Sequence, residues 1–425
     1  MGEYQNIARE LLDFLDQSPT CFHAVWNMKE MLQNAGFEKL REDQRWNLVA
    51  GGKYFVTRNG SAIIAFTIPE KMTKGTGYRI IASHSDSPAF KIKENPEIVV
   101  ENQYVKLNTE GYGGMILSSW LDRPLSIAGR VIIKEDGAYV SKLINIDRDL
   151  LMIPNLAIHM NREVNKGYAY NKQKDMLPIL GGIESKEAFD GLIKEAAGNP
   201  EEILGHDLYL YNRQKGTIFG GKEELIASGR LDDLQCAYGS LQGLLAGEKK
   251  HYVAVHCVLD NEEVGSLTKQ GAASTFLKDT LERINFAFGG DEEDYRVSLA
   301  KSFMLSADNA HAVHPNHPEK SDPTNRIYLN GGVVIKMNAD QKYCTDGVSA
   351  AMCKDLCKEA GVPVQTFVNR SDVPGGSTLG NISTAQVSVN AVDIGLPQLA
   401  MHASYEMAGV KDTAYLIQLA KVFFA

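Results

Sequence analysis

Two adjacent glutamates, Glu262 and Glu263, follow a short apolar segment at residues 251–258. The segment has the length of a buried strand rather than that of a helix. Like charges held close together raise each other's pKa, so two carboxylates at a strand end are costly neighbours. A bound cation would explain the pair, since one carboxylate can hold the ion while the other stays free to accept a proton. Glu-Glu doublets are also common on solvated surfaces, so the doublet needs support from other residues.

Four other polar groups share this context, because each lies just after an apolar strand or beside the start of a helix. They are His84-Ser85-Asp86, Asp232-Asp233, Asp308 and His402. In open α/β sheets ligands bind where the carboxyl ends of the strands meet, so these groups are expected to converge. Imidazole and carboxylate ligands suit Zn²⁺ and similar divalent ions. Two ions about 3.5–4 Å apart need a bridging carboxylate and a few further ligands each, and the set is large enough for that.

Each member of the set also has a purely structural interpretation. A single histidine at a strand end is more often a packed or surface residue than a ligand, and Asp86 fits a turn in which it accepts a local hydrogen bond. A second histidine cluster at residues 311–317 has zinc-like spacing. Pro315 and Pro318 prevent a continuous helix there, so the sequence predicts a loop with a structural role.

A segment at residues 216–222 nearly matches the spacing of a phosphate-binding P-loop. Glu223 occupies the position at which Ser or Thr would coordinate Mg²⁺, and a carboxylate there repels phosphate. The sequence therefore argues against nucleotide binding.

The elements around the polar groups predict an α/β protein with a β-rich insertion. Residues 4–35 have the apolar spacing of two helices, with a break at Ser18-Pro19-Thr20, and Asn59-Gly60 separates two strands as a hairpin turn. From about residue 93 to about residue 228, strand-like pieces alternate with long polar connections. Helix–strand alternation returns afterwards. We therefore expect one domain from residues 1–92 and 229–425, and an inserted β-rich domain from residues 93–228.

Composition narrows the class of protein. A chain of 425 residues is too long for one ordinary core, which predicts two domains. The net charge of -9, without a Lys/Arg-rich stripe, argues against nucleic-acid binding. No apolar run approaches the ~20 residues of a membrane span. The first residues lack the features of a signal peptide, and six scattered cysteines without a Cys-x-x-Cys pair are typical of free thiols, so we expect a cytoplasmic protein.

Five motifs, in chain order, resemble those of the M18 family of metallo-aminopeptidases, which includes the aspartyl aminopeptidases. They are Ala82-Ser83-His84-Ser85-Asp86-Ser87-Pro88, Gly229-Arg230-Leu231-Asp232-Asp233-Leu234, Leu259-Asp260-Asn261-Glu262-Glu263-Val264-Gly265, Ser306-Ala307-Asp308-Asn309-Ala310-His311-Ala312-Val313-His314-Pro315 and Leu396-Pro397-Gln398-Leu399-Ala400-Met401-His402. The similarity extends over essentially the whole chain. It implies an α/β fold with a mixed-sheet, zinc-peptidase-like catalytic domain and an inserted β-rich dimerisation domain.

The resemblance implies a pair of divalent metal ions, with zinc first and cobalt or manganese as alternatives. Asp232 would bridge the two ions. His84 and Asp308 would complete one site, and Glu263 and His402 the other.

The resemblance also assigns roles to three residues around the metals. Glu262 would be the general base, and Asp86 would hydrogen-bond the far nitrogen of His84 and so fix its tautomer. In relatives, dimers build a tetrahedral dodecamer in which a histidine from a neighbouring subunit reaches the active site. The matching residue is His159, which would help to stabilise the oxyanion while Glu262 carries the proton from water to the leaving amine.

The implied reaction is removal of the N-terminal residue from peptides, and its specificity is the most open point. A preference for N-terminal Asp or Glu requires a cation in the side-chain pocket, and Lys336 stands at the matching position, with Tyr343 lining the same pocket. An exposed lysine at a strand end is the alternative. Family members also include enzymes that prefer apolar residues, and the family's Asp-Thr-Pro-Cys-Gly-Thr-Thr segment is replaced here at residues 372–378. Hydrolysis of N-acyl amino acids is the alternative reaction for the same metal chemistry.

Overall fold

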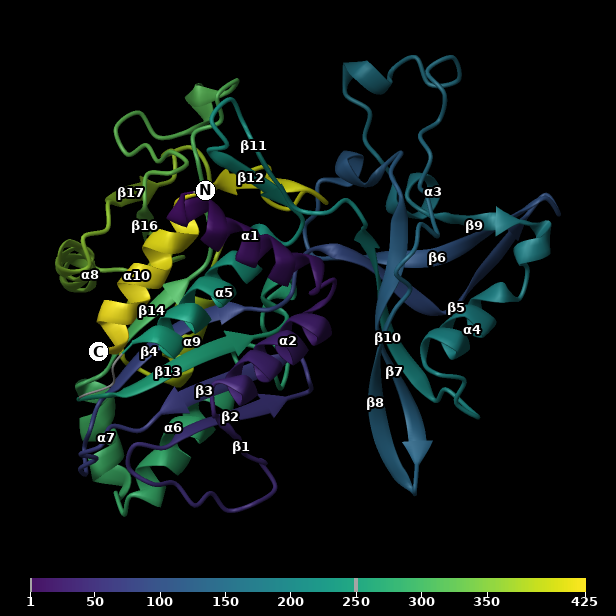
Figure 1. The fold of residues 1–425 in the computed structure, drawn as a ribbon. Coiled ribbons are helices and arrows are strands. Elements are labelled where there is room, and N and C mark those ends of the chain that lie inside the picture. Colours follow the sequence, from purple (N-terminus) through teal and green to yellow (C-terminus); the bar gives the residue numbers. More distant parts are fainter. Residues whose placement is uncertain (1, 248–250) are drawn as a thin grey trace.

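The computed structural model describes residues 2–247 and 251–425, and it contains two bodies that lie side by side (Figure 1). A nine-stranded mixed sheet forms the centre of the larger body, in the order β1-β2-β3-β13-β4-β14-β18-β16-β17. Its strands are β1 (Glu38–Lys39), β2 (Lys53–Arg58), β3 (Ala62–Thr67), β4 (Tyr78–His84), β13 (Val253–Leu259), β14 (Phe303–Ala307), β16 (Val333–Met337), β17 (Val364–Val368) and β18 (Asn390–Gly395). The neighbours β13, β4, β14 and β18 are parallel. Strand β3 is antiparallel to both β2 and β13, whereas β16 is antiparallel to β18 and parallel to β17.

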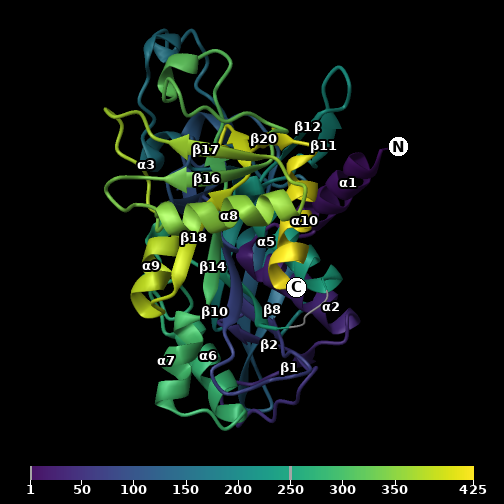
Figure 2. The same cartoon turned by 90° about the vertical axis from the view of Figure 1, so that its left-hand side faces the viewer.

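Helices cover both faces of this sheet because its central strands are apolar on both sides. All seven residues of β13 are buried, and successive side chains point to opposite faces, so Val258 packs into one core and Leu259 into the other. The first core is shared with α1 (Glu3–Asp16), α2 (Cys21–Asn34), α5 (Leu231–Ala246), α8 (Gly347–Glu359) and α10 (Asp412–Phe424). The second is shared with α6 (Phe276–Ala287), α7 (Glu292–Ala300) and α9 (Leu379–Gln386). Figure 2 shows α6, α7 and α9 on one side of the strands and α1, α2 and α10 on the other.

A six-stranded antiparallel sheet, in the order β8-β7-β10-β5-β6-β9, forms the smaller body. Its elements are β5 (Ala89–Val100), β6 (Tyr104–Tyr112), β7 (Leu125–Glu135), β8 (Ala138–Asn145), α3 (Lys172–Asp175), β9 (Ile179–Gly182), α4 (Ala188–Ala196) and β10 (Gly205–Asn212). An Asp136-Gly137 turn joins β7 to β8, and both residues have positive φ, as the tight hairpin turn requires. A separate hydrophobic core lies between this sheet and α4.

A five-stranded sheet connects distant parts of the chain. It contains β11 (Thr217–Phe219), β12 (Leu225–Ser228), β15 (Ala310–His311), β19 (Pro397–Leu399) and β20 (Glu406–Gly409), in the order β11-β12-β20-β19-β15. Residues 217–228, which we expected in the insertion, therefore pair with strands of the C-terminal part. The six-stranded sheet itself runs from Ala89 to Asn212.

The mixed α/β architecture expected from the sequence is confirmed. The two N-terminal helices are present, and the chain breaks between them at residues 17–20. The P-loop-like segment forms β11 and a turn that leads into β12, without the helix that a phosphate-binding loop precedes. None of the helices in the described ranges is both long and apolar enough to cross a membrane.

Candidate metal centre

The polar groups predicted to converge lie at one edge of the nine-stranded sheet. Strands β13, β4 and β14 are parallel neighbours, and Leu259 pairs with His84 in register. The residues that follow their carboxyl ends, including Glu263 and Asp308, therefore emerge side by side. Asp232 is added from the start of α5, and His402 from the loop between β19 and β20.

Asp232 lies between the two histidines. Its Oδ1 atom is 3.4 Å from Nε2 of His84, and its Oδ2 atom is 3.3 Å from Nε2 of His402. The same His402 nitrogen is 3.3 Å from Oε1 of Glu263. The Asp232 carboxylate thus presents one oxygen to each of the two imidazoles.

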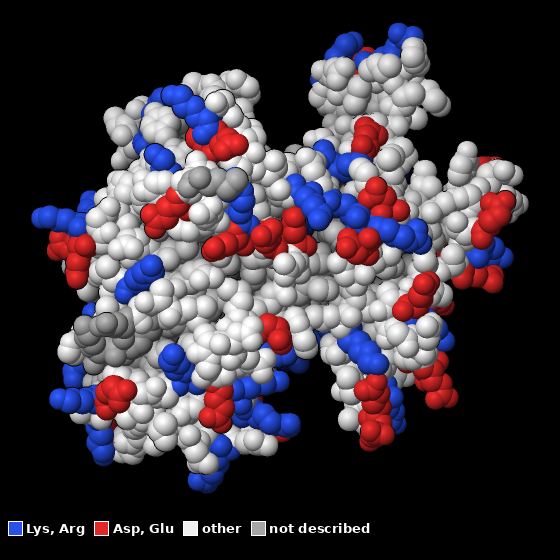
Figure 3. All heavy atoms as spheres, viewed as in Figure 1, with Lys and Arg blue, Asp and Glu red and all other residues white. Residues whose placement is uncertain are grey.

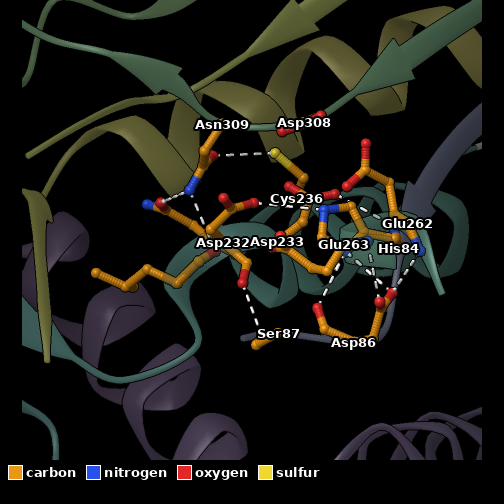
Figure 4. Close-up of polar contacts among 12 residues, drawn as sticks. His84, Asp86, Ser87, Asp232, Asp233, Cys236, Glu262, Glu263, Asp308 and Asn309 are labelled. Atoms are coloured by element: carbon orange, nitrogen blue, oxygen red, sulfur yellow. Dashed lines mark hydrogen bonds and ion pairs between the residues drawn. The ribbon is translucent and has the colours of Figure 1, made fainter. Parts of the chain in front are cut away.

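Asp308 approaches Asp232 from the other side. Oxygen atoms of Asp232, Asp233 and Asp308 lie within 4.8 Å of one another, and so do ligand atoms of His84, Asp232 and Glu263. Figure 4 shows these side chains pointing toward a common centre, with Glu262 beside them. The five ligands predicted from the sequence are therefore brought together.

Several of these oxygen atoms have no hydrogen-bond partner among the described residues. They are Oδ1 of Asp232, Oδ1 of Asp233 and Oε1 of Glu263, and all three are buried. A buried carboxylate oxygen without a partner is costly, and a cation supplies the missing interaction. Two imidazoles and several carboxylates are a donor set that zinc accepts. The residues therefore fit divalent metal ions.

The crowding of charge shifts the pKa values of these groups. Burial lowers the pKa of His402, but its hydrogen bond with Asp232 and the charge of Glu263 outweigh this and raise that pKa to about 10. Burial likewise lowers the pKa of His84, yet Asp232 and Asp86 raise it well above its usual value. Burial, together with the charge of Asp232, raises the pKa of Glu263. A cation that binds these groups therefore competes with the protons that the raised pKa values favour.

Asp86 holds the glutamate doublet in place. Its carboxylate accepts hydrogen bonds from the backbone N–H groups of Glu262 at 3.1 Å and Glu263 at 3.2 Å, and from the Tyr112 hydroxyl at 2.7 Å. The nearest partner of the far nitrogen of His84, Nδ1, is the backbone carbonyl of Asp86 at 3.0 Å, whereas the Asp86 carboxylate is 3.4 Å away. Asp86 thus contacts His84 with both its backbone and its side chain.

Two carboxylates that sequence reasoning did not assign a role also contact the ligands. Glu406 accepts hydrogen bonds from the backbone N–H groups of Asp232 at 3.1 Å and His402 at 2.7 Å. Asp233, joined to Asp232 by a cis peptide bond, accepts one from the backbone N–H of His84 at 3.2 Å. Asp233 stands in a motif that we identified, but Glu406 lies inside a short strand and carries no recognisable pattern.

Lys336 is buried, with 3% of its surface exposed, so it is not a solvated lysine at a strand end. Its Nζ atom is 3.7 Å from Oδ1 of Asp308 and 3.3 Å from the carbonyl oxygen of Asn309. The ring of Tyr343 lies 5.3 Å from the same atom. The lysine charge therefore adjoins the metal centre.

His159 lies away from the cluster. It is exposed in the long connection between β8 and β9, and no hydrogen bond or ion pair joins it to the ligands among the described residues. Of the histidines at residues 311–317, His311 ends β15 and is affected by the charges of Lys336, Asp232 and His402. His314 and His317 follow in an exposed loop, where their rings lie 5.3 Å apart. None of these four histidines outside the cluster belongs to a metal-compatible group in the described ranges.

Comparison with known proteins relates the chain to one family of aminopeptidases. The family described as "Aminopeptidase I zinc metalloprotease (M18)" matches residues 14–424. The chain is 49% identical over 424 residues to a "Probable M18 family aminopeptidase 2" of Clostridium novyi (strain NT), with 98% of both chains covered. A chain in the cryo-EM structure of the Ape4 and Nbr1 complex is similar with a TM-score of 0.95 and 36% identity, covering 99% of this chain and 86% of that one. The S. cerevisiae mApe1 dodecamer matches with a TM-score of 0.88 and 28% identity, covering 100% and 97%.

Loading the metal-free protein with Zn²⁺ near neutral pH should release protons. His84, His402 and Glu263 have raised pKa values, and each must lose its proton before it can bind a cation. We expect release of up to about three protons per chain, one from each of these groups, and an affinity for Zn²⁺ that falls as the pH is lowered because protons then compete. Calorimetric titrations in buffers of different ionisation enthalpy measure this number. A binding enthalpy that is the same in every buffer would contradict the expectation.

Proposed function

The chain belongs to the M18 family of zinc metallo-aminopeptidases, and on that premise we propose that it uses two divalent cations to remove an acidic N-terminal residue from peptides. The observation that carries this proposal is the position of Asp232 between His84 and His402. A carboxylate with one oxygen facing each imidazole has the geometry needed to bridge two ions.

We assign His84 and Asp308 to one ion, Glu263 and His402 to the other, and Asp232 to both. The proximity of Asp308 to Asp232 and of Glu263 to His402 supports this division. Zinc is the expected ion, and cobalt and manganese tolerate the same ligands.

Bound divalent cations supply Lewis-acid activation of water and of the scissile carbonyl. Glu262 is our candidate for the general base, because it lies beside the ligands without belonging to a metal-compatible group of described residues. Burial raises its pKa to about 8, although the charge of His84 acts in the opposite direction. In this role the Glu262 carboxylate accepts a proton from the attacking water and returns it to the leaving amine. Its backbone bond to Asp86 holds it in position for both transfers.

Lys336 is our candidate for recognition of the substrate side chain. Its burial beside Tyr343 makes its charge effective, since water does not screen it. A carboxylate at the end of a short N-terminal side chain would add to the compensation of this charge that Asp308 provides at 3.7 Å. An acidic first residue is therefore the preferred substrate in this proposal.

The connection that carries His159 supports self-association. Leu156, Ile158 and Met160 flank His159 and are 53%, 46% and 75% exposed. On the face shown in Figure 3 the projection that contains them has a mostly uncharged flank below a tip that carries lysine and arginine side chains. We propose that a second copy covers this surface, that the six-stranded body is a dimerisation domain, and that His159 enters the neighbouring active site in a tetrahedral dodecamer. All six cysteines are free thiols. Free thiols are typical of a reducing compartment, which supports our proposal of a cytoplasmic protein.

A panel of aminoacyl substrates tests the reaction and its specificity. With metal-free protein refilled with Zn²⁺, Co²⁺ or Mn²⁺ in turn, we expect cleavage of Asp and Glu substrates with a free amine and none of their N-acetylated forms. Lys336→Met should remove the preference for acidic over neutral first residues, because the compensating charge is lost. Lys342→Met is the matched control, since Lys342 is exposed on the connection that follows β16. Preferential cleavage of N-acetylated substrates would favour a deacylase instead.

Substitution of Glu262 separates proton transfer from metal binding. Glu262→Gln should keep the metal content and lower kcat by about 10²–10⁴-fold, the usual contribution of a general base. Asp232→Ala should lose both metal and activity, because both sites share that carboxylate. Elemental analysis of the dialysed proteins and steady-state kinetics measure the two effects. Normal turnover of Glu262→Gln would remove Glu262 from this role.

Mixing two inactive variants tests whether His159 acts in a neighbouring subunit. His159→Ala and Glu262→Gln should each be nearly inactive alone. After random reassembly of equal amounts, about a quarter of the sites would combine an intact Glu262 with an intact His159 from a neighbour. Kinetics after dissociation and reassociation, with sedimentation to confirm assembly, measure the recovery. Reassembled mixtures without recovered activity would place His159 outside a shared site.

A further inference from the structure

The segment of residues 112–119 leaves β6 of the six-stranded body and runs along the metal centre of the other body. We name it the clamp. Building on the proposed two-metal function, we propose that the clamp positions Glu263 and His402. The affinity of the ion assigned to these two ligands would then depend on the packing of the two bodies, whereas the affinity of the other ion would not.

The clamp fixes the ring of His402. The backbone carbonyl of Gly114 lies 2.7 Å from Nδ1 of His402 and accepts a hydrogen bond from that nitrogen when it is protonated. This bond selects the tautomer that leaves Nε2 free, and Nε2 is the atom that faces Asp232 and Glu263. The orientation of this ligand is therefore set by a backbone atom of the smaller body.

The clamp also fixes the backbone around His402. The N–H of Ile116 donates to the His402 carbonyl at 3.0 Å, and the N–H of Ser404 donates to Oγ of Ser119 at 2.8 Å. His402 has a φ of 68°, a left-handed conformation that is uncommon for a residue with a side chain and persists where neighbours hold it. The side-chain amide of Asn212, at the end of β10, donates to the Ser404 carbonyl at 3.1 Å.

Glu263 contacts the same segment. A Cβ atom placed on Gly113, whose φ is +76°, would lie 3.1 Å from Cβ of Glu263, so the two backbones pass close together. The Tyr112 hydroxyl donates to Asp86, whose carboxylate also accepts the N–H of Glu263. Both ligands assigned to one ion thus touch the clamp or its direct partner.

Asp308, a ligand of the other ion, is held within the larger body. Its N–H donates to the carbonyl of Ile394 in β18, and Lys336 of β16 lies beside its carboxylate. Among the described residues no hydrogen bond or ion pair joins Asp308 to the clamp. The backbone N–H of His84 donates to Asp233, which also belongs to the larger body. Asp86, the partner of Tyr112, also contacts His84, so the contacts specific to one ion are those of Gly113 with Glu263 and of Gly114 and Ile116 with His402. Apart from Asp86 and the shared Asp232, the two ions are held by different parts of the fold.

Ser119→Ala tests this difference without touching a ligand, because it removes the acceptor of the Ser404 N–H. In calorimetric titrations of the metal-free protein with Zn²⁺, one of the two affinities should fall by about 10–100-fold, the usual effect of losing a partner that orients a ligand. The other affinity should stay unchanged. Ser118→Ala is the matched control. Ser118 precedes Ser119 and its side chain is exposed, so this substitution should leave both affinities unchanged. Gly113→Ala, which presses on Glu263, is expected to act like Ser119→Ala.

The affected ion is identified in variants that keep only one site. In a Glu263→Gln background, which retains the ion of His84 and Asp308, adding Ser119→Ala should not change the remaining affinity. In an Asp308→Asn background, which retains the other ion, it should lower that affinity by the same factor as before. If Ser119→Ala lowers the Zn²⁺ affinity equally in both backgrounds, or in neither, the proposed role of the clamp is wrong. A wild-type protein that binds only one ion would instead overturn the two-metal function, together with the selectivity inferred from it.

Discussion

The burial of several carboxylates beside one another is the constraint on which the structure of the site depends. Asp232, Glu262, Glu263 and Asp308 converge where parallel strands end, and burial together with the other charges raises the pKa of three of them. Asp232 differs, because the adjacent imidazoles of His402 and His84 overcome its burial and lower its pKa. A cluster of buried carboxylates is stable only if protons or cations compensate its negative charge. Its cost in the metal-free state is therefore the source of its affinity for metal.

The convergence itself was predictable from the sequence. Short apolar segments that end in His84, Glu262 and Asp308 indicate parallel strands, and parallel strands place their carboxyl ends at one edge. The apolar spacing of residues 4–35 likewise predicted the two N-terminal helices that the structure contains. In each case the information lies within one local pattern and needs no knowledge of distant contacts.

The residues that hold the ligands in place could not be predicted from the sequence, and the reason is physical. Gly114 contributes only its carbonyl to His402, and every residue has a carbonyl, so no side-chain pattern marks it. Glu406 acts on two backbone N–H groups from inside a short strand. The burial of Lys336 and the pairing of residues 217–228 with β20 depend on contacts between segments far apart in the chain. Local propensity does not encode such contacts.

The passage of the smaller body along the metal centre affects how separable the two bodies are. The six-stranded sheet is one uninterrupted stretch of chain with its own core, which usually marks a module that can be deleted or exchanged. Here residues 114 and 116 hold both the ring and the backbone of His402. Removing the module would also remove the contacts that orient His402. Substitutions in the clamp are therefore constrained by the chemistry of the site as well as by packing. If the six-stranded body were exchanged between relatives, the clamp would have to be exchanged with it.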